Sequence, residues 1–427
     1  MNTEPSQPEW HYIVGLEIRG PVTLEQLAGL IANGTVPETV IIAAKQSAGW
    51  RPAGEVLHAA RAEKISQSDL PPLPNVGPGV ASAAPKTARS LLDQIGDTLN
   101  QMVGTEKLEK FSLGEIFSET FQKRSVAEME EYFIVGTERT TPKIADVQTG
   151  WPKPWLFMRL LLFFVVVYAG FVVAYEQFGN TNLIPGLILM GAFAMPLTTL
   201  ILFFELNTPR NVSIYRLLVL VGLGGIASLA ISLIGYNLGH LDWLGASGAG
   251  IIEELGKLAA LVLIVRGARY KYILNGMLFG AAVGAGFAAF ESAGYAFQNI
   301  IGDGPRAMLD NIWLRGLLAP MGHVTWTAMV GAALWRVKGR EPITLEVFLN
   351  PKFYRVLFLA MGLHMLWNCP LNPPFYLKEL VLGAVGWFVI WGLVQQGLRQ
   401  VRDEQRAAEA ANPSEIIQLA IERSKSA

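Results

Sequence analysis

Two adjacent glutamates and a lysine, Glu253, Glu254 and Lys257, lie inside an apolar segment that continues to Val265. The segment is long enough to cross a bilayer, where an ionised side chain costs at least ~2.5–3.5 kcal/mol on insertion scales. These groups therefore require a polar cavity or a charged partner. In a helix, Glu253 and Lys257 share one face, while Glu254 lies about 100° around the axis. The segment is compatible with a buried Glu–Lys pair that joins helices, or with a carboxylate that activates water.

Polar residues at helical spacing also occur in three later apolar segments. The i, i+4 pairs, each of which presents one helix face, are Phe287 and Glu291, His323 and Thr327, and His364 and Asn368. Carboxylates and imidazoles transfer protons in catalysis and also bind metal ions. We expect the acids and imidazoles of these segments to meet in one shared pocket.

The composition indicates a membrane protein. Of the 427 residues, 51% are apolar and only 16% are charged, against roughly 25% charged residues in soluble domains. The formal net charge of −1 argues against a nucleic acid as the main partner. The single cysteine, Cys369, excludes an intrachain disulfide and a cysteine-based zinc site.

The apolar residues after Trp155 form long runs separated by short polar connections. They predict a polytopic all-α membrane protein with about eight transmembrane helices, preceded by a small α+β domain in the cytoplasm. The predicted spans are 155–175, 183–204, 215–238, 247–266, 273–297, 313–335, 353–369 and 378–398.

The charges in the connections predict the orientation in the membrane. Lys and Arg are frequent after the second, fourth, sixth and eighth spans and rare elsewhere, apart from Arg306 and Arg315 between spans five and six. By the positive-inside rule both termini are cytoplasmic, in agreement with a polar N-terminus that has no signal-peptide core. This orientation places the acids and imidazoles of four spans in the outer third of the bilayer. The fifth span is rich in glycine and alanine, which predicts close helix packing.

The N-terminal residues predict a small domain with strands at 10–14 and 40–43 and a helix capped by Thr23. An opening Trp10-x-Tyr12, a central Gly-Pro and a Gly-Trp pair ending at Trp50 resemble the bacterial GYF-like domain. The resemblance implies an adaptor that binds proline-rich peptide through Trp10, Tyr12 and Trp50. The same aromatic residues are equally compatible with the core of a small domain.

Four motifs follow in order on separate predicted spans: Glu253-Glu254-x-x-Lys257, Phe287-x-x-x-Glu291, a lone His323, and His364-x-x-x-Asn368. Together they resemble the PrsW family of intramembrane proteases, a distant relative of the type II CAAX prenyl endopeptidases. The resemblance covers about residues 111–398, with Asn275 where an aspartate is expected. It implies an endopeptidase of the bacterial inner (cytoplasmic) membrane that cleaves a membrane-anchored protein near the extracytoplasmic side.

The expected catalytic residues are Glu253, Glu254, Glu291, His323, His364 and Asn368, with Lys257 and Phe287 in supporting roles. One of the adjacent glutamates is the candidate base, and the other orients it or pairs with the lysine. The histidines either stabilise the oxyanion with Asn368 or bind a metal ion together with Glu291, zinc being the candidate. No His-Glu-x-x-His is present, and we slightly favour hydrolysis without a metal.

These features predict five regions along the chain. They are a GYF-like adaptor domain at 1–62, a Pro/Gly/Ala-rich linker at 63–88, amphipathic juxtamembrane helices at 89–150, an eight-helix protease domain at 151–400 and a cytoplasmic tail at 401–427. The linker prolines at 71, 72 and 74 are a candidate internal ligand for the adaptor domain.

Two other functions remain open. A proton-coupled transporter or channel would use the Glu/His cluster as a relay, whereas a scaffold would function through its N-terminal domain alone. The lack of a convincing inverted repeat argues against transport. We interpret His240 as a surface residue, Cys369 as a packing residue and Glu205 as an interfacial anchor.

Overall fold

The computed structural model describes most of the chain, in two compact units. The described residues are 10–14, 17–32, 35–37, 40–44, 50–53, 56–57, 91–106, 108, 111–265 and 270–411. The predicted linker at 63–88, with its proline cluster, and residues 412–427 of the predicted tail lie outside them. One unit comprises Met1–Ala88, Lys143–Asp146 and Asp403–Ala427, and the other comprises Arg89–Pro142 and Val147–Arg402.

The N-terminal domain is an antiparallel sheet with one helix. Its elements are β1 (Trp10–Val14), β2 (Glu17–Val22), α1 (Leu24–Ala32), β3 (Ile41–Ala44) and β4 (Arg51–Pro52), and the strand order is β2-β1-β3-β4. Thr23 caps α1 as predicted, because its hydroxyl accepts a hydrogen bond from the Gln26 amide at 3.2 Å. The strand β2 was not predicted, since its residues are mostly exposed and lack an apolar alternation.

The three aromatic residues proposed for peptide binding all lie in this domain. Trp10 and Tyr12 are alternate residues of β1 and therefore point to the same face of the sheet. Both are partly buried and pack against the core formed around Leu27 and Ile42. Trp50 is partly buried just before β4. Their placement suits the core and a binding surface alike, so the peptide-binding role remains a prediction.

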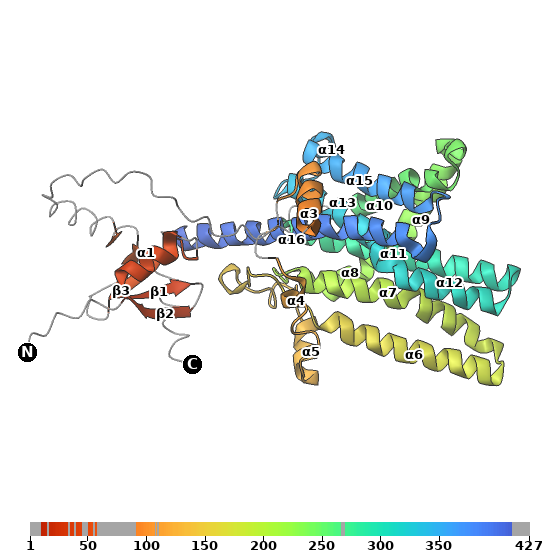
Figure 1. Ribbon diagram of the computed structural model, residues 1–427, viewed down its shortest axis with the longest axis horizontal. Coiled ribbons are helices and arrows are strands. Elements are labelled where there is room, and N and C mark those ends of the chain that lie inside the picture. Colours follow the sequence, from red (N-terminus) through yellow and green to blue (C-terminus); the bar gives the residue numbers. More distant parts are fainter. Residues whose placement is uncertain are drawn as a thin grey trace, which may run out of the picture. The chain divides into compact units, whose positions relative to one another are not determined.

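The second unit is helical throughout (Figure 1). Its α-helices, the last of which continues into the first unit, are α3 (Leu91–Met102), α4 (Leu113–Ile116), α5 (Val126–Phe133), α6 (Leu156–Phe178), α7 (Ile184–Leu206), α8 (Ile214–Val219), α9 (Gly225–Gly239), α10 (Ala249–Ile264), α11 (Ile273–Gly302), α12 (Pro305–Leu318), α13 (His323–Lys338), α14 (Leu345–Leu349), α15 (Pro351–Asn368) and α16 (Leu377–Ala411). A π-helical turn at Leu220–Gly224 joins α8 to α9.

Six helical segments among the described residues are long and apolar enough to cross a membrane. They are Leu156–Phe178, Thr181–Leu206, Ile214–Gly239, Ile273–Gly302, Pro305–Lys338 and Pro374–Ala408. The protein is therefore a mainly helical, multi-pass membrane protein, but the predicted count of about eight spans is not confirmed. The two predicted spans outside this set are α10, with 16 residues, and α15, with 18 residues. At 1.5 Å per residue α10 is about 24 Å long, less than a typical bilayer core of about 30 Å.

The predicted span 313–335 lies within the candidate span Pro305–Lys338, but it is not one continuous α-helix. It is broken by a 3-10 turn at Ala319–Met321, and His323 is the first residue of the new helix α13. Pro320 cannot continue the hydrogen-bonding pattern of α12, and Gly322 adopts a non-helical backbone, φ −110° and ψ −135°. The break moves His323 from the middle of a helix to its N-terminus.

The helices α11 and α13 cross at very short range. A Cβ atom at Gly280 would lie 2.1 Å from the Thr327 carbonyl oxygen, and one at Gly284 would lie 2.5 Å from the His323 carbonyl oxygen. Gly331 faces Gly276 across the same crossing. The small residues thus permit the close packing that the sequence predicted, and they fix the position of His323 relative to α11. Thr327 is buried in this crossing and does not accompany His323 into a polar site.

We predict that Gly280→Ala destabilises the protein by about 1–3 kcal/mol, because the new methyl group overlaps the backbone of α13. The matched control is Gly294→Ala on the same helix, where a Cβ meets nothing within 4 Å. The control is expected to be neutral or slightly stabilising, since alanine favours helices. Thermal unfolding in detergent measures both variants, and equal melting temperatures would contradict the close crossing.

Glu205 has a different role from the predicted interfacial anchor. It is 5% exposed, and its carboxylate accepts hydrogen bonds from the backbone amides of Trp155, Leu156 and Phe157 at 2.7, 2.8 and 2.9 Å. These amides open α6, which has no side-chain cap of its own. A carboxylate satisfies the free N–H groups and complements the helix dipole, so Glu205 ties α6 to α7.

Replacing Glu205 by alanine is expected to cost at least about 1–3 kcal/mol, since buried amides lose their acceptors. Glu176→Ala, an exposed glutamate near the other end of α6, serves as the control. Thermal unfolding of the purified proteins measures the difference, and a melting temperature for Glu205→Ala equal to that of the control would disprove the capping role.

Asn275, which occupies the expected aspartate position, belongs to a buried amide cluster near the start of α11. Its Nδ2 donates to Asn207 Oδ1 at 2.9 Å and to Asn211 Oδ1 at 2.6 Å, and its Oδ1 accepts from Asn211 Nδ2 at 3.2 Å. An aspartate would supply the acceptor but no donor. The cluster joins α11 to the connection between α7 and α8, so asparagine here serves packing.

Candidate active site

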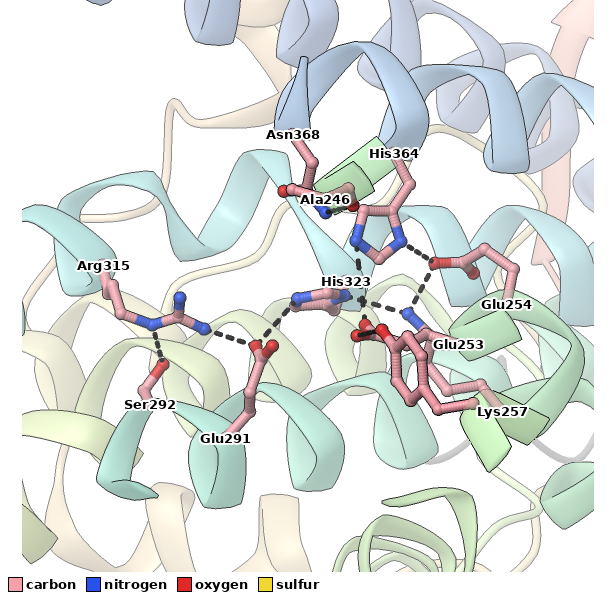
Figure 2. A network of polar contacts seen from close by, with 11 residues as sticks. Ala246, Glu253, Glu254, Lys257, Glu291, Ser292, Arg315, His323, His364 and Asn368 are labelled. Atoms are coloured by element: carbon pink, nitrogen blue, oxygen red, sulfur yellow. Dashed lines mark hydrogen bonds and ion pairs between the residues drawn. The ribbon is translucent and has the colours of Figure 1, made fainter. Parts of the chain in front are cut away.

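One continuous chain of polar contacts links side chains from six helices (Figure 2). Its members are Tyr236 on α9, Glu253, Glu254 and Lys257 on α10, Glu291 on α11, Arg315 on α12, His323 on α13 and His364 on α15. The sequence singled out all of these residues except Tyr236 and Arg315 as site residues. The structure therefore brings together the acids and imidazoles of the four motifs.

Lys257 connects two of the motifs. Its Nζ donates to Glu254 Oε1 at 2.5 Å and to His323 Nδ1 at 2.9 Å, and it lies 4.6 Å from the centre of the Phe287 ring. The side chains of Glu254 and Lys257 have no exposed surface. Lys257 thus pairs with the i, i+3 glutamate, although the helical spacing had placed Glu253 on its face.

His323 is held from both sides of its ring. An ammonium group can only donate, so the contact with Lys257 makes Nδ1 the acceptor and leaves the proton on Nε2. That Nε2 lies 3.1 Å from Glu291 Oε2 and donates to it. Phe287 packs against the ring at 5.0 Å between centres, which is the supporting role predicted for it.

His364 is oriented by Glu254 and by a tryptophan. Its Nδ1 lies 3.0 Å from Glu254 Oε1, and because Glu254 is an ionised acceptor beside Lys257, Nδ1 carries the proton. The lone pair of Nε2 then faces Glu253, whose Oε2 is 3.7 Å away. The ring stacks on Trp326 at 4.6 Å, with 28° between the planes.

Glu291 has a counterion that the sequence analysis missed as a site residue. Arg315 Nη2 donates to Glu291 Oε2, and Arg315 Nε donates to Ser292 Oγ at 2.8 Å (Figure 2). The available signal was that Arg315 is one of two arginines that break the positive-inside pattern. The pairing with Glu291 explains why an arginine lies at this position without reference to membrane topology.

Glu253 is the one carboxylate of this chain of contacts without a cationic partner. Glu254 pairs with Lys257 and Glu291 pairs with Arg315. Glu253 Oε1 instead accepts from the neutral Tyr236 hydroxyl at 2.7 Å, and its buried Oε2 has no hydrogen-bond partner. An unpaired buried acceptor in a native site calls for an unseen water or ion. Glu254 Oε2 is likewise without a hydrogen-bond partner, but Glu254 Oε1 is held by Lys257 and His364, so Glu254 is occupied in positioning and Glu253 is available for chemistry.

These residues border a cavity of about 780 Å³. Its lining includes Glu253, Glu291, His323 and His364, together with Ala319 and Gly322 of the helix break. Irregular backbone at membrane depth is tolerated where it lines a cavity, which explains the position of the break. Asn368 also lines the cavity, but its Nδ2 donates to the Ala246 carbonyl at 3.3 Å and not to the acids or imidazoles.

A metal-binding group lies in the same place. Ligand atoms of Glu253, His323 and His364 lie within 4.8 Å of one another, whereas the predicted set contained Glu291 in place of Glu253. Two imidazoles and a carboxylate are a donor set that zinc accepts. Glu254 on the other nitrogen of His364 corresponds to the carboxylate that often supports a histidine ligand. Glu253 Oε2 and His364 Nε2 are open donors for a divalent ion, and His323 can supply Nδ1 where the ion takes the place of the Lys257 contact.

Comparison with known families agrees with the geometry. Residues 182–394 match the model of the PrsW family of intramembrane metalloproteases, and residues 10–57 match GYF domain 2. The chain belongs to the PrsW family. No curated protein and no solved structure matches the chain. As a PrsW protein it is an intramembrane peptide hydrolase, so the transporter alternative is not favoured, and the family's metalloprotease character runs against the preference for metal-free hydrolysis.

In this PrsW protein, Lys257→Met is predicted to destabilise the fold by about 3–5 kcal/mol, because it leaves the buried Glu254 carboxylate uncompensated. Adding Glu254→Gln removes the stranded charge and should restore most of the stability. Lys352→Met, at an exposed lysine of α15, is the control. Thermal unfolding compares the variants, and a single variant as stable as the double variant would show that the pair is not buried as described.

Proposed function

We propose that this protein hydrolyses a peptide bond of a membrane-anchored protein near the extracytoplasmic side of the bacterial inner membrane. The observation that carries the proposal is the grouping of Glu253, His323 and His364 beside a second cavity-lining carboxylate, Glu291. Peptide hydrolysis requires an activated water, a proton acceptor and a donor for the developing oxyanion. The cavity provides side chains for each of these tasks.

In this proposal Glu253, His323 and His364 would hold a divalent metal ion, with His323 Nδ1 exchanging its contact with Lys257 for the ion, and their donor atoms favour zinc. When bound, such an ion polarises a carbonyl oxygen and makes its water a stronger acid. Glu253 contributes its free Oε2, since Oε1 is engaged by Tyr236. Glu254 and Glu291 hold the two imidazoles through the ring nitrogens that carry the proton, His364 Nδ1 and His323 Nε2.

Glu291 is the proposed proton acceptor. Arg315 and His323 both bind its Oε2, so Oε1 is left to take a proton from the attacking water and later to return it to the leaving amine. This assigns the base to Glu291 in place of Glu253 or Glu254. Asn368, which lines the same cavity, is the proposed oxyanion donor.

The orientation follows from the ends of the helices. The helices α10 and α13 begin near the site and α15 ends near it, so the site lies toward one end of the membrane unit. The helices α3, α4 and α5 gather at the opposite end, where α6 begins (Figure 1). They expose Met102, Leu113 and Val126, as helices on a membrane surface do. With both termini cytoplasmic by the positive-inside rule, the site faces the extracytoplasmic side.

The N-terminal domain is the proposed point of recruitment. GYF domains are of the proline-rich-binding type, and Trp10, Tyr12 and Trp50 are the proposed contact residues. We assign the adaptor to residues 1–62, the linker to 63–88, the juxtamembrane helices to 89–150, the protease domain to 151–400 and the tail to 401–427. The partners are a membrane-anchored protein substrate, the lipid bilayer and a proline-rich peptide.

Two glutamine variants separate the proposed roles of the carboxylates. Glu253→Gln should lose most of its zinc affinity and its cleavage together, whereas Glu291→Gln should retain zinc and lose on the order of 10²–10⁴-fold in cleavage rate. The measurements are the zinc content of chelated and reloaded protein and the cleavage of a membrane-anchored reporter in proteoliposomes. Full cleavage by Glu253→Gln or by chelated wild-type protein would refute the proposed site, and Glu176→Gln controls for loss of an unrelated exposed carboxylate.

A further inference from the structure

Tyr236 is the only member of the chain of contacts that comes from α9, and neither the motifs nor their spacing pointed to it. Its hydroxyl donates to Glu253 Oε1 at 2.7 Å, and its side chain borders the catalytic cavity. A hydrogen bond to an ionised acceptor is stronger and more directional than one between neutral groups. Tyr236 therefore restrains the orientation of the Glu253 carboxylate.

The other two members of the metal-binding group are already restrained by ionic partners. His364 donates to Glu254, and His323 contacts both Lys257 and Glu291. Glu253 has several rotatable bonds, and no lysine or arginine of the described residues forms an ion pair with it. A ligand usually needs a supporting partner of this kind, and loss of one weakens metal affinity by about 10–100-fold. For Glu253, the Tyr236 hydroxyl fills that place.

The chemical nature of this partner matters as much as its position. Lysine and arginine neutralise Glu254 and Glu291, which leaves those carboxylates with little charge to offer a metal ion. A phenol donates a hydrogen bond without neutralising the acceptor. The negative charge of Glu253 is thereby kept for the free Oε2, which faces His364 Nε2 at 3.7 Å.

We propose that Tyr236 is a positioning residue that holds Glu253 Oε1, so that Oε2 is directed, with its charge intact, at the ion-binding point between His323 and His364. This inference rests on the proposed role of Glu253 as a metal ligand. Tyr236 acts through Glu253, and its removal should matter only while that carboxylate is present.

The cavity supplies a matched control in Tyr295. The two tyrosines are similarly exposed, at 42% and 44%, and both line the cavity. The Tyr295 hydroxyl makes no hydrogen bond within the described part of the chain, and its ring lies 4.6 Å from the Arg315 guanidinium. Tyr295→Phe keeps that ring contact, so it removes a cavity hydroxyl without touching the metal-binding group.

The experiment titrates the full-length, chelated protein in detergent with zinc alone. Tyr236→Phe is expected to weaken zinc affinity by about 10-fold or more, whereas Tyr295→Phe retains the wild-type affinity. Melting temperatures without metal should be alike, because both variants keep their rings. In the Glu253→Gln background, Tyr236→Phe should cause no additional loss in residual zinc binding, since the two changes remove one interaction.

Each outcome decides a separate point. If Glu253→Gln loses zinc but Tyr236→Phe binds zinc like Tyr295→Phe, the positioning role is overturned and the proposed function stands. If wild-type protein binds no zinc, or Glu253→Gln binds it normally, the proposed metal site itself fails and the inference falls with it. Additive losses in the double variant would assign Tyr236 to general packing.

Discussion

The structure depends on accommodating three carboxylates inside a bundle of apolar helices. Removing such groups from water is costly, and the cost is offset only by close, well-oriented partners. Lys257 and Arg315 neutralise two of the carboxylates, while Glu253 has a phenol and an imidazole beside it. This pairing leaves Glu253 as the carboxylate of the chain of contacts without a lysine or arginine partner. It also explains why the chain of contacts crosses six helices, since no single helix carries all the partners.

The glycines of α11 and α13 bring these partners within reach. A Cβ at Gly280 or Gly284 would overlap the backbone of α13, so the two helices lie closer than larger residues allow. The break at Ala319–Met321 then starts α13 at His323, where the imidazole reaches both Lys257 and Glu291. Glycines inside helices and a helix break usually destabilise a bundle, but here they position the histidine.

Much of the site followed from residue types and spacing. An ionisable group in an apolar helix needs polar neighbours, so one shared pocket was expected for the acids and imidazoles of the motifs. The structure has one cavity lined by Glu253, Glu291, His323 and His364. The family resemblance drawn from the same motifs was confirmed by the matched family model. Arg315 and Tyr236 were missed because neither belongs to a motif. The spacing of residues along the chain does not indicate which helices lie opposite one another in the folded protein.

The sequence by itself determined the class of the protein, its membrane-spanning character, its N-terminal domain and most of the side chains that meet in the site. These properties depend on hydrophobicity, local turns and short helical intervals, all of which are encoded in neighbouring residues. Only the tertiary structure decided that Lys257 pairs with Glu254, that Glu205 caps α6 and that the carboxylate grouped with His323 and His364 is Glu253. Those choices depend on the rotation and separation of helices distant in sequence, where a shift of a few ångströms selects one carboxylate over its neighbour.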